Sequence, residues 1–522
     1  MKSKNLNSMI LFVAALLFIT GCVPNTQLVR EEGEIQRELP NQFPDYKVPL
    51  SKGEEELIDY SKPDDNAIPK EDNGQVTKIK APLVEKPSDT PWEDFFSDVN
   101  LKNLVAEALK NNQELNIISQ EINISKNEMM ARQGEYLPKL GFKGENGIEK
   151  VGHYTHRGAT DSTTEYEPGK FVPEDLKNYS VGLTFSWEID IWKKLRNATK
   201  SALYSYLASI DGKNFMVTNL VAEIASTYYE LLALDSELEI VNTNLEIQEK
   251  ALKLVKLQKQ AARVTSLAVK RFEAEVLKNQ SRRFELRQKI IQMENKLNML
   301  AGRYPQPVQR NAKMFLEIMP QNLADSIPSN LLERRPDVRQ AQNRLKAANL
   351  DIKVAKARFY PSLSIEAGVG YESFNSKHLF MSPESVFYNL AGNLTAPLLN
   401  RQAIKADYLS ANAKQVQAVF EYEQTLIRAF TEVTNQMAKI ENYKRSYRLK
   451  LKQVEALNDS VEISNVLFKA ARADYVEVLM TRRDALESQI ELVEIKRKLL
   501  DSFVTLYQSL GGGWTKDETL TE

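Results

Sequence analysis

The sequence predicts a mainly α-helical chain that carries four β-strands. Two long stretches, residues 213–301 and 398–510, contain neither glycine nor proline, as is typical of long helices. Residues 178–192 alternate apolar and polar side chains, which is typical of a strand with one apolar and one polar face. Segments of the first half also recur in the second half, so we expect both halves to have the same order of elements.

Sequence matches define the two halves. GEYLPKLGFKGENG (134–147) matches ARFYPSLSIEAGVG (357–370), which pairs Pro138 with Pro361, and LNMLAGRYP (297–305) matches LYQSLGGGW (506–514). A period of roughly 210 residues is too long for a solenoid repeat and indicates a duplicated half-molecule. We expect a first repeat at 92–306, a linker at 307–329, a second repeat at 330–514 and a polar tail at 515–522.

Each half is expected to contain a helix, two strands and two further helices, in that order. Pro138 and Pro361 end the first helix of each half, because proline breaks the helical ladder and disfavours helix in the residue before it. Alternating apolar residues predict a strand after each proline. Polar loops at about 150–177 and 372–385 then connect this strand to the second strand of each half. The helix that ends near Ala471 would then span on the order of 100 Å.

The N-terminus has the pattern of an export signal. Lys2 and Lys4 precede an apolar run at 9–19 that is too short to span a bilayer, which predicts a signal peptide at 1–21. The run ends in LFITGC, which resembles a bacterial lipobox and implies that Cys22 becomes the acylated first residue. Cys22 is the only cysteine, so an intramolecular disulfide is excluded. An ordinary cleaved signal with an incidental cysteine is the alternative. Residues 22–91, rich in charged residues and proline, are expected to form an extended segment behind the lipid anchor.

Composition excludes several classes of function. The 69 basic residues nearly cancel the 70 acidic ones, so no global field favours nucleic acid as a partner. The histidines, His153, His156 and His378, lie in polar loops without a nearby cysteine and make a poor metal site. Phosphate-binding Gly-rich loops and nucleophile elbows are absent from the sequence. We therefore expect no enzyme activity, no metal and no cofactor.

The number of strands restricts how the chain can meet a membrane. Four strands cannot close a barrel, because the smallest membrane barrels need about eight, and open sheet edges are not tolerated in lipid. If the strands enter a bilayer, chains must associate, and two copies would supply eight strands while three would supply twelve. Two soluble hairpins packed on helical bundles remain the alternative on these grounds.

One long segment carries a family resemblance. LLERRPDVRQAQNRLKAANLDIKVAKARFYPSLSIEAG (331–368) resembles the signature of the TolC and OprM type outer-membrane efflux proteins, and the resemblance extends over roughly 91–514. Within it, Pro336 suits the first helical turn and Asp337 places a negative charge near the positive helix end. Arg335, Pro336 and Asp337 therefore form a structural motif rather than a catalytic one.

The resemblance implies a fold, a location and a function. It implies a homotrimer with a twelve-stranded barrel in the lipid of the Gram-negative outer membrane and a long α-helical barrel in the periplasm. It also implies passive exit for small molecules in a tripartite efflux system, with a periplasmic adaptor and an inner-membrane pump as partners. The exit duct of a type I protein-secretion system is the alternative with the same fold, and a lipid-anchored coiled-coil scaffold without a pore is the alternative of a different class. In such a barrel, Tyr179, Trp187 and Trp192 would lie in the aromatic belt at the membrane interface. The alternative is that they are ordinary strand-end aromatics, as in soluble sheets.

Two helix turns, near 260–277 and 469–486, resemble the periplasmic tips of that family. The resemblance places Glu477 in a ring of carboxylates at the periplasmic gate, and Asp474, three residues earlier on the same helix face, is a further candidate. The alternative is that both acids pair with Arg472, Arg482 or Arg483 on a solvated surface. The chain departs from the family at Arg263, Ala268, Ala471 and Met480. The candidates for adaptor docking at the tips are Ser266, Leu267, Tyr475 and Val476.

Overall fold

The computed structural model describes residues 91–262, 264–312, 315–318, 329–399, 401–470 and 472–512. The expected signal peptide, Cys22, the segment up to residue 90, Arg263, Ala471 and the tail at 515–522 lie outside the described residues. The described chain forms two compact units. The sheet unit comprises residues 121–209 and 341–422, and the helical unit comprises the described parts of 91–120, 210–340 and 423–512.

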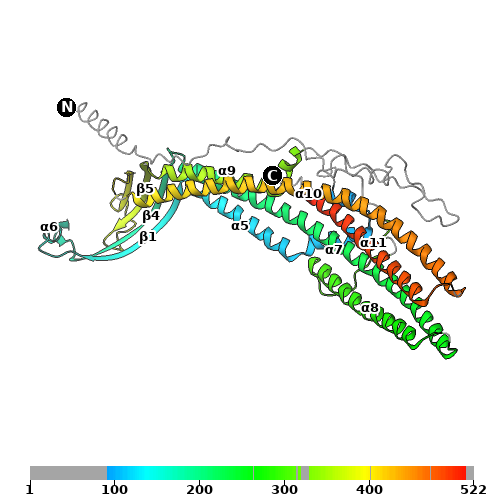
Figure 1. Ribbon diagram of the computed structural model, residues 1–522. Coiled ribbons are helices and arrows are strands. Elements are labelled where there is room, and N and C mark those ends of the chain that lie inside the picture. Colours follow the sequence, from blue (N-terminus) through cyan, green and yellow to red (C-terminus); the bar gives the residue numbers. More distant parts are fainter. Residues whose placement is uncertain are drawn as a thin grey trace. The chain divides into compact units, whose positions relative to one another are not determined.

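In their long elements, both halves show the expected order of helix, strand, strand, helix, helix (Figure 1). The first half contains α3 (Trp92–Phe95), α4 (Val99–Asn111), α5 (Gln113–Tyr136), β1 (Lys139–Lys150), α6 (His156–Asp161), β2 (Glu165–Glu167), β3 (Lys170–Phe171), β4 (Asp175–Ile189), α7 (Lys194–Gln260) and α8 (Ser266–Leu300). The second half contains a 3-10 helix (Ser329–Arg334), α9 (Pro336–Ala357), β5 (Ser362–Ser373), β6 (Val386–Thr395), α10 (Gln402–Lys469) and α11 (Tyr475–Ser509).

The helix ends agree with the proline positions. Helix α5 ends two residues before Pro138, and α9 ends at Ala357, shortly before Pro361. The first loop differs from the expected irregular segment, because it contains α6 and the short hairpin β2–β3. Thr155 starts α6, since its Oγ1 accepts a hydrogen bond from the Gly158 amide at 3.1 Å.

The four long strands form one antiparallel sheet in the order β1-β4-β5-β6. The pair β4–β5 joins the two halves of the chain, with Tyr179 opposite Ser373 and Ile189 opposite Leu363. Strands β1 and β6 are the edges, and in the described residues neither has a partner on its outer side.

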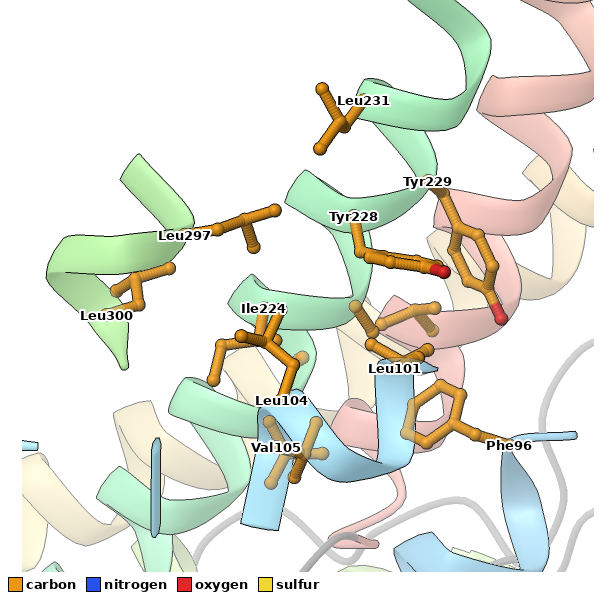
Figure 2. Close-up of a cluster of buried hydrophobic side chains, with 14 of the residues drawn as sticks. Phe96, Leu101, Leu104, Val105, Ile224, Tyr228, Tyr229, Leu231, Leu297 and Leu300 are labelled. Atoms are coloured by element: carbon orange, nitrogen blue, oxygen red, sulfur yellow. The ribbon is translucent and has the colours of Figure 1, made fainter. Parts of the chain in front are cut away.

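The core of the helical unit packs α4 against α7, α8 and α11. Leu101 and Val105 of α4 lie against Ile224 and Tyr228 of α7, as Figure 2 shows. The Tyr228 hydroxyl donates to Asp98 at 2.8 Å, so the polar end of this buried ring is satisfied. The same Asp98 caps α4 through its other carboxylate oxygen, which accepts from Asn100 N at 2.8 Å. Side chains from both halves build this core.

The duplication is visible in how the last helix of each half ends. Gly302 and Gly511 both have positive φ angles, 68° and 80°, which glycine adopts without a Cβ penalty. Near each glycine, a helix carbonyl accepts a hydrogen bond from a distant side chain. Asn112 Nδ2 donates to Leu300 O at 2.9 Å in the first half, and Arg335 Nη1 donates to Ser509 O at 2.7 Å in the second.

Arg335 of the Arg-Pro-Asp motif also contacts residues far from the start of α9. Arg335 is 4% exposed and forms ion pairs with Asp337 at 2.8 Å and Glu432 at 2.9 Å, in addition to its bond to Ser509. Its guanidinium therefore connects the start of α9 with α10 and the end of α11, and buried guanidinium groups require such pairing.

Candidate functional site

The long sheet has one apolar and one polar face. In an antiparallel sheet, residues directly opposite each other share a face. Leu140 lies opposite Phe185, Phe185 opposite Ala367, and Ala367 opposite Leu390, so one apolar row crosses all four strands. The next apolar row contains Phe142, Leu183, Val369 and Tyr388.

The intervening rows are polar. Lys139 lies opposite Ser186, and Ser186 opposite Glu366, while Glu188 lies opposite Ser364. The same face carries Lys143, Glu145, Thr184, Glu372, Asn389 and Asn393, with Phe387 as an apolar exception. The alternation that residues 179–189 show in the sequence therefore holds across the whole sheet.

The apolar face is open in the single chain. Phe142 is 74% exposed, Leu390 77% and Tyr388 84%. An apolar patch of this extent marks a surface that contacts lipid or another protein. The two open edges, β1 and β6, add unpaired backbone groups that can pair with further strands.

Two tryptophans tie the foot of the sheet to neighbouring segments. Trp187 Nε1 donates to Tyr136 O at 3.2 Å at the end of α5. Trp192 Nε1 donates to Pro361 O at 2.8 Å and its ring stacks on Tyr360 with centroids 4.8 Å apart. These contacts give both side chains, and Pro361, a structural role at the junction of strand and helix. Whether Trp187 and Trp192 also belong to an interfacial belt stays a prediction.

Helix α8 has a second apolar stripe on its outer side. Val269, Phe272, Val276, Leu286 and Ile290 are buried. Another series is exposed at heptad spacing: Leu277, Phe284 and Ile291, each at least half exposed. Such a repeat is typical of a helix that packs on a partner helix, and the described residues of the chain supply none on this side.

The two predicted helix turns lie where the sequence places them. Helix α7 ends at Gln260 and α8 begins at Ser266, while α10 ends at Lys469 and α11 begins at Tyr475. Thr265 caps α8 through Oγ1, which accepts from the Ala268 amide at 3.4 Å, and Ala262 has a positive φ of 59°. Thus both helix pairs turn within five residues.

The structure brings the two tips together through an apolar cluster, defined by buried Val255, Ala268, Val269 and Phe272. Tyr475 and Leu479 of α11 pack against it. Part of the Tyr475 side chain, a docking candidate, is therefore covered by this cluster. Ala268, which departs from the family pattern, is fully buried. Ser266 and Leu267 are exposed at the start of α8, and Val476 is half-buried.

Both gate candidates are exposed, and neither has an ion-pair partner among the described residues. Glu477 lies in the first turn of α11, and Asp474 is the N-cap residue of that helix, without a side-chain capping bond. Arg483 instead pairs with Asp484 at 3.2 Å, and Arg482 donates to Asn465 at 2.8 Å. Among the described residues, the alternative pairing of Glu477 with Arg472, Arg482 or Arg483 does not occur.

Two features are absent from the described residues. None of the described helices combines the length and the apolar character needed to span a membrane. Within the same residues, no three histidine, cysteine, aspartate or glutamate side chains are grouped as metal ligands would be.

Comparison with known proteins decides the family. The model of the family described as outer membrane efflux protein matches residues 104–303 and 327–512. The chain belongs to this family. The matched residues include Pro138, the Arg335–Asp337 motif, Pro361 and both tips. The outer membrane efflux protein family is one of channels, so the chain is an outer-membrane efflux channel and not an enzyme.

Relatives in the family are similar over most of their length. The pyoverdine export outer membrane protein OpmQ of Pseudomonas aeruginosa is 26% identical over 82% of this chain and 88% of its own. The probable outer membrane lipoprotein SilC of Salmonella typhimurium is 25% identical over 83% and 90%. The cation efflux system protein CusC of Escherichia coli is 25% identical over 81% and 88%.

Solved structures confirm the fold class. A crystal structure of CusC matches with a TM-score of 0.72 at 23% identity, covering 84% of this chain and 99% of that one. The outer membrane protein VceC of Vibrio cholerae matches with a TM-score of 0.71 at 22% identity, covering 81% and 98%. The expected mainly α chain with a membrane β portion is therefore confirmed.

Proposed function

We propose that this efflux channel is the passive exit duct of a tripartite system and that three copies assemble to form it. The observation that carries the proposal is the sheet of four strands, which has one open apolar face, one polar face and two unpaired edges. A membrane barrel needs these features, because its outside meets lipid, its inside meets water and no edge remains.

Edge pairing supports assembly from identical copies. When β1 of one copy pairs with β6 of the next, three sheets close a twelve-stranded barrel. The apolar rows that contain Phe142 and Leu390 then face lipid, and the polar rows that contain Glu366 and Asn389 face the water-filled pore. In the helical unit, the exposed stripe Leu277, Phe284 and Ile291 of α8 packs on a helix of the neighbouring copy.

The tips form the periplasmic mouth in this proposal. Glu477 has no partner among the described residues, so three-fold symmetry would place three unpaired carboxylates around the mouth. Asp474 adds a carboxylate at the N-cap of the same helix. Ser266 and Leu267 offer an exposed surface for the periplasmic adaptor, and Tyr475 and Val476 at the start of α11 are the candidates at the second tip. The adaptor and an inner-membrane pump complete the system, since the duct has no energy source.

Acylation and cargo complete the proposal. The lipobox-like sequence at Cys22 would attach the chain to the outer membrane by a lipid, in agreement with the name of the relative SilC as a probable lipoprotein. The relatives are named for export of pyoverdine and efflux of cations, so we propose small molecules as cargo.

A pair of variants on adjacent residues of β6 tests the orientation of the sheet. Leu390→Arg places a charge on the apolar face, whereas Asn389→Arg places the same charge on the polar face. An arginine facing lipid at mid-membrane costs about 2–4 kcal/mol per copy. We expect Leu390→Arg to reduce the detergent-extractable oligomer in the outer membrane fraction, and Asn389→Arg to leave it at the wild-type amount. Equal effects of the two variants would refute the proposed orientation.

A further inference from the structure

The polar face of the sheet borders a cavity of about 700 Å³ at the junction with α5, α7 and α9. Its strand residues are Lys139, Ser186, Glu188 and Ser364, together with Trp187. The first four belong to the polar rows defined by the strand register. All lining residues lie in the sheet unit, so the cavity is a property of that unit alone.

The cavity wall carries more positive than negative charge. Its basic residues are Arg132, Lys139, Lys194 and Arg358, and its acidic residues are Glu135 and Glu188. Each acid is already neutralised within the wall. Arg132 pairs with Glu135 at 3.2 Å, and Lys194 pairs with Glu188 at 2.5 Å.

The two remaining cations have no carboxylate partner among the residues that line the cavity. Arg358 pairs through Nη1 with Asp407 at 2.6 Å, and Asp407 does not line the cavity. Among the described residues, no carboxylate lies within ion-pair distance of Lys139. An ammonium and a guanidinium are thus directed to one wall that also holds the hydroxyls of Ser186 and Ser364, which are further donors for carboxylate oxygens.

We propose that this cavity is a binding subsite for small multivalent carboxylates in the wall of the pore. The proposal rests on the proposed function in one respect, because the barrel must turn the polar face inward for cargo to reach the site. Lys139 and Arg358 hold the carboxylates, and the serine hydroxyls donate further hydrogen bonds. The barrel foot would then attract anions, in contrast to the acidic mouth at Glu477.

Citrate is the probe for the test. Purified full-length channels are placed in planar bilayers, and citrate added on the barrel side is titrated while single-channel current is recorded. Lys139→Gln is compared with Lys143→Gln, which removes the same charge from the same face of the same strand. Lys143 pairs with Glu145 at 2.6 Å and does not line the cavity. Calorimetric titration of citrate into the detergent-solubilised chain gives a second measurement that needs no conducting pore.

We expect Lys139→Gln to raise the citrate concentration for half-block and the calorimetric Kd roughly fivefold, as for a partly exposed charge pair. Lys143→Gln should behave as wild type. The subsite is overturned if citrate does not bind, or if both variants weaken binding equally, because the effect would then belong to the general field of the pore. Failure of the chain to conduct would count against the proposed channel, while the calorimetric comparison still decides the subsite.

Discussion

Lys496 provides a test of how the helical unit packs. The side chain lies in α11 and is 1% exposed, and its ammonium lies 5.0 Å from the centre of the Tyr447 ring. Burial lowers the pKa of Lys496 to about 8 from an ordinary 10.5. One pKa unit corresponds to about 1.4 kcal/mol, so a charged Lys496 destabilises the folded state by roughly 3 kcal/mol at neutral pH.

Replacing Lys496 with methionine removes this cost and retains an unbranched side chain. The attraction between the ammonium and the ring offsets about 1 kcal/mol, so we expect Lys496→Met to stabilise the protein at pH 7 by about 2 kcal/mol. The gain depends on pH in a defined direction. Above pH 8 the folded wild type loses the proton while the unfolded chain keeps it up to about pH 10.5. Wild-type stability therefore rises over this window, and the advantage of the variant falls.

Thermal unfolding of the detergent-solubilised channel measures the effect. The difference in midpoint temperature between Lys496→Met and wild type should be positive at pH 7 and less than half as large at pH 9.5. Lys498→Met is the control, because the Lys498 side chain is 44% exposed and pairs with Glu494 at 3.4 Å. A gain from Lys496→Met that is the same at both pH values, or a loss at pH 7, would show that the buried ammonium is not the cause.

Two further changes test the helix connections and the mouth. Arg335→Ala leaves Glu432 and the Ser509 carbonyl without their partner and should lower the free energy of unfolding by about 3 kcal/mol. Asn112→Ala, the corresponding change in the first half, removes two neutral hydrogen bonds, to Leu300 O and from Leu115 N, and should cost about 2 kcal/mol. A larger loss in Asn112→Ala than in Arg335→Ala, measured by chemical denaturation, would contradict this reasoning. At the mouth, Glu477→Gln should reduce cation selectivity in single-channel reversal potentials, whereas Glu487→Gln, an exposed change further along α11, should not. Unchanged selectivity in Glu477→Gln would exclude it from the gate.

Local sequence signals predicted the elements well. Long stretches without glycine or proline predicted the long helices, and Pro138 and Pro361 predicted where the first helices end. The helix turns at the tips were predicted from the family resemblance of 260–277 and 469–486, since neither segment contains a glycine or proline that would mark a turn. The alternation at 179–189 predicted two sheet faces, since side chains of a strand point to opposite sides at every step.

Contacts between residues far apart in the sequence could not be predicted in this way. Arg335 contacts Glu432 and Ser509, which are 97 and 174 residues away along the chain. The motif therefore looked local, with a role only at the start of α9. Lys496 lies in a charged stretch and would be assigned to the surface by composition, although the structure buries it. The small helix and hairpin of the first loop were missed because their polar sequence has no clear periodicity.

We propose above that other copies of the same chain complete the open sheet. The mass of the detergent-extracted channel, measured by light scattering with the bound detergent subtracted, tests it most directly. We expect the mass of three chains, from a sample that conducts ions across a planar bilayer. A particle with the mass of one chain and no conductance would contradict it.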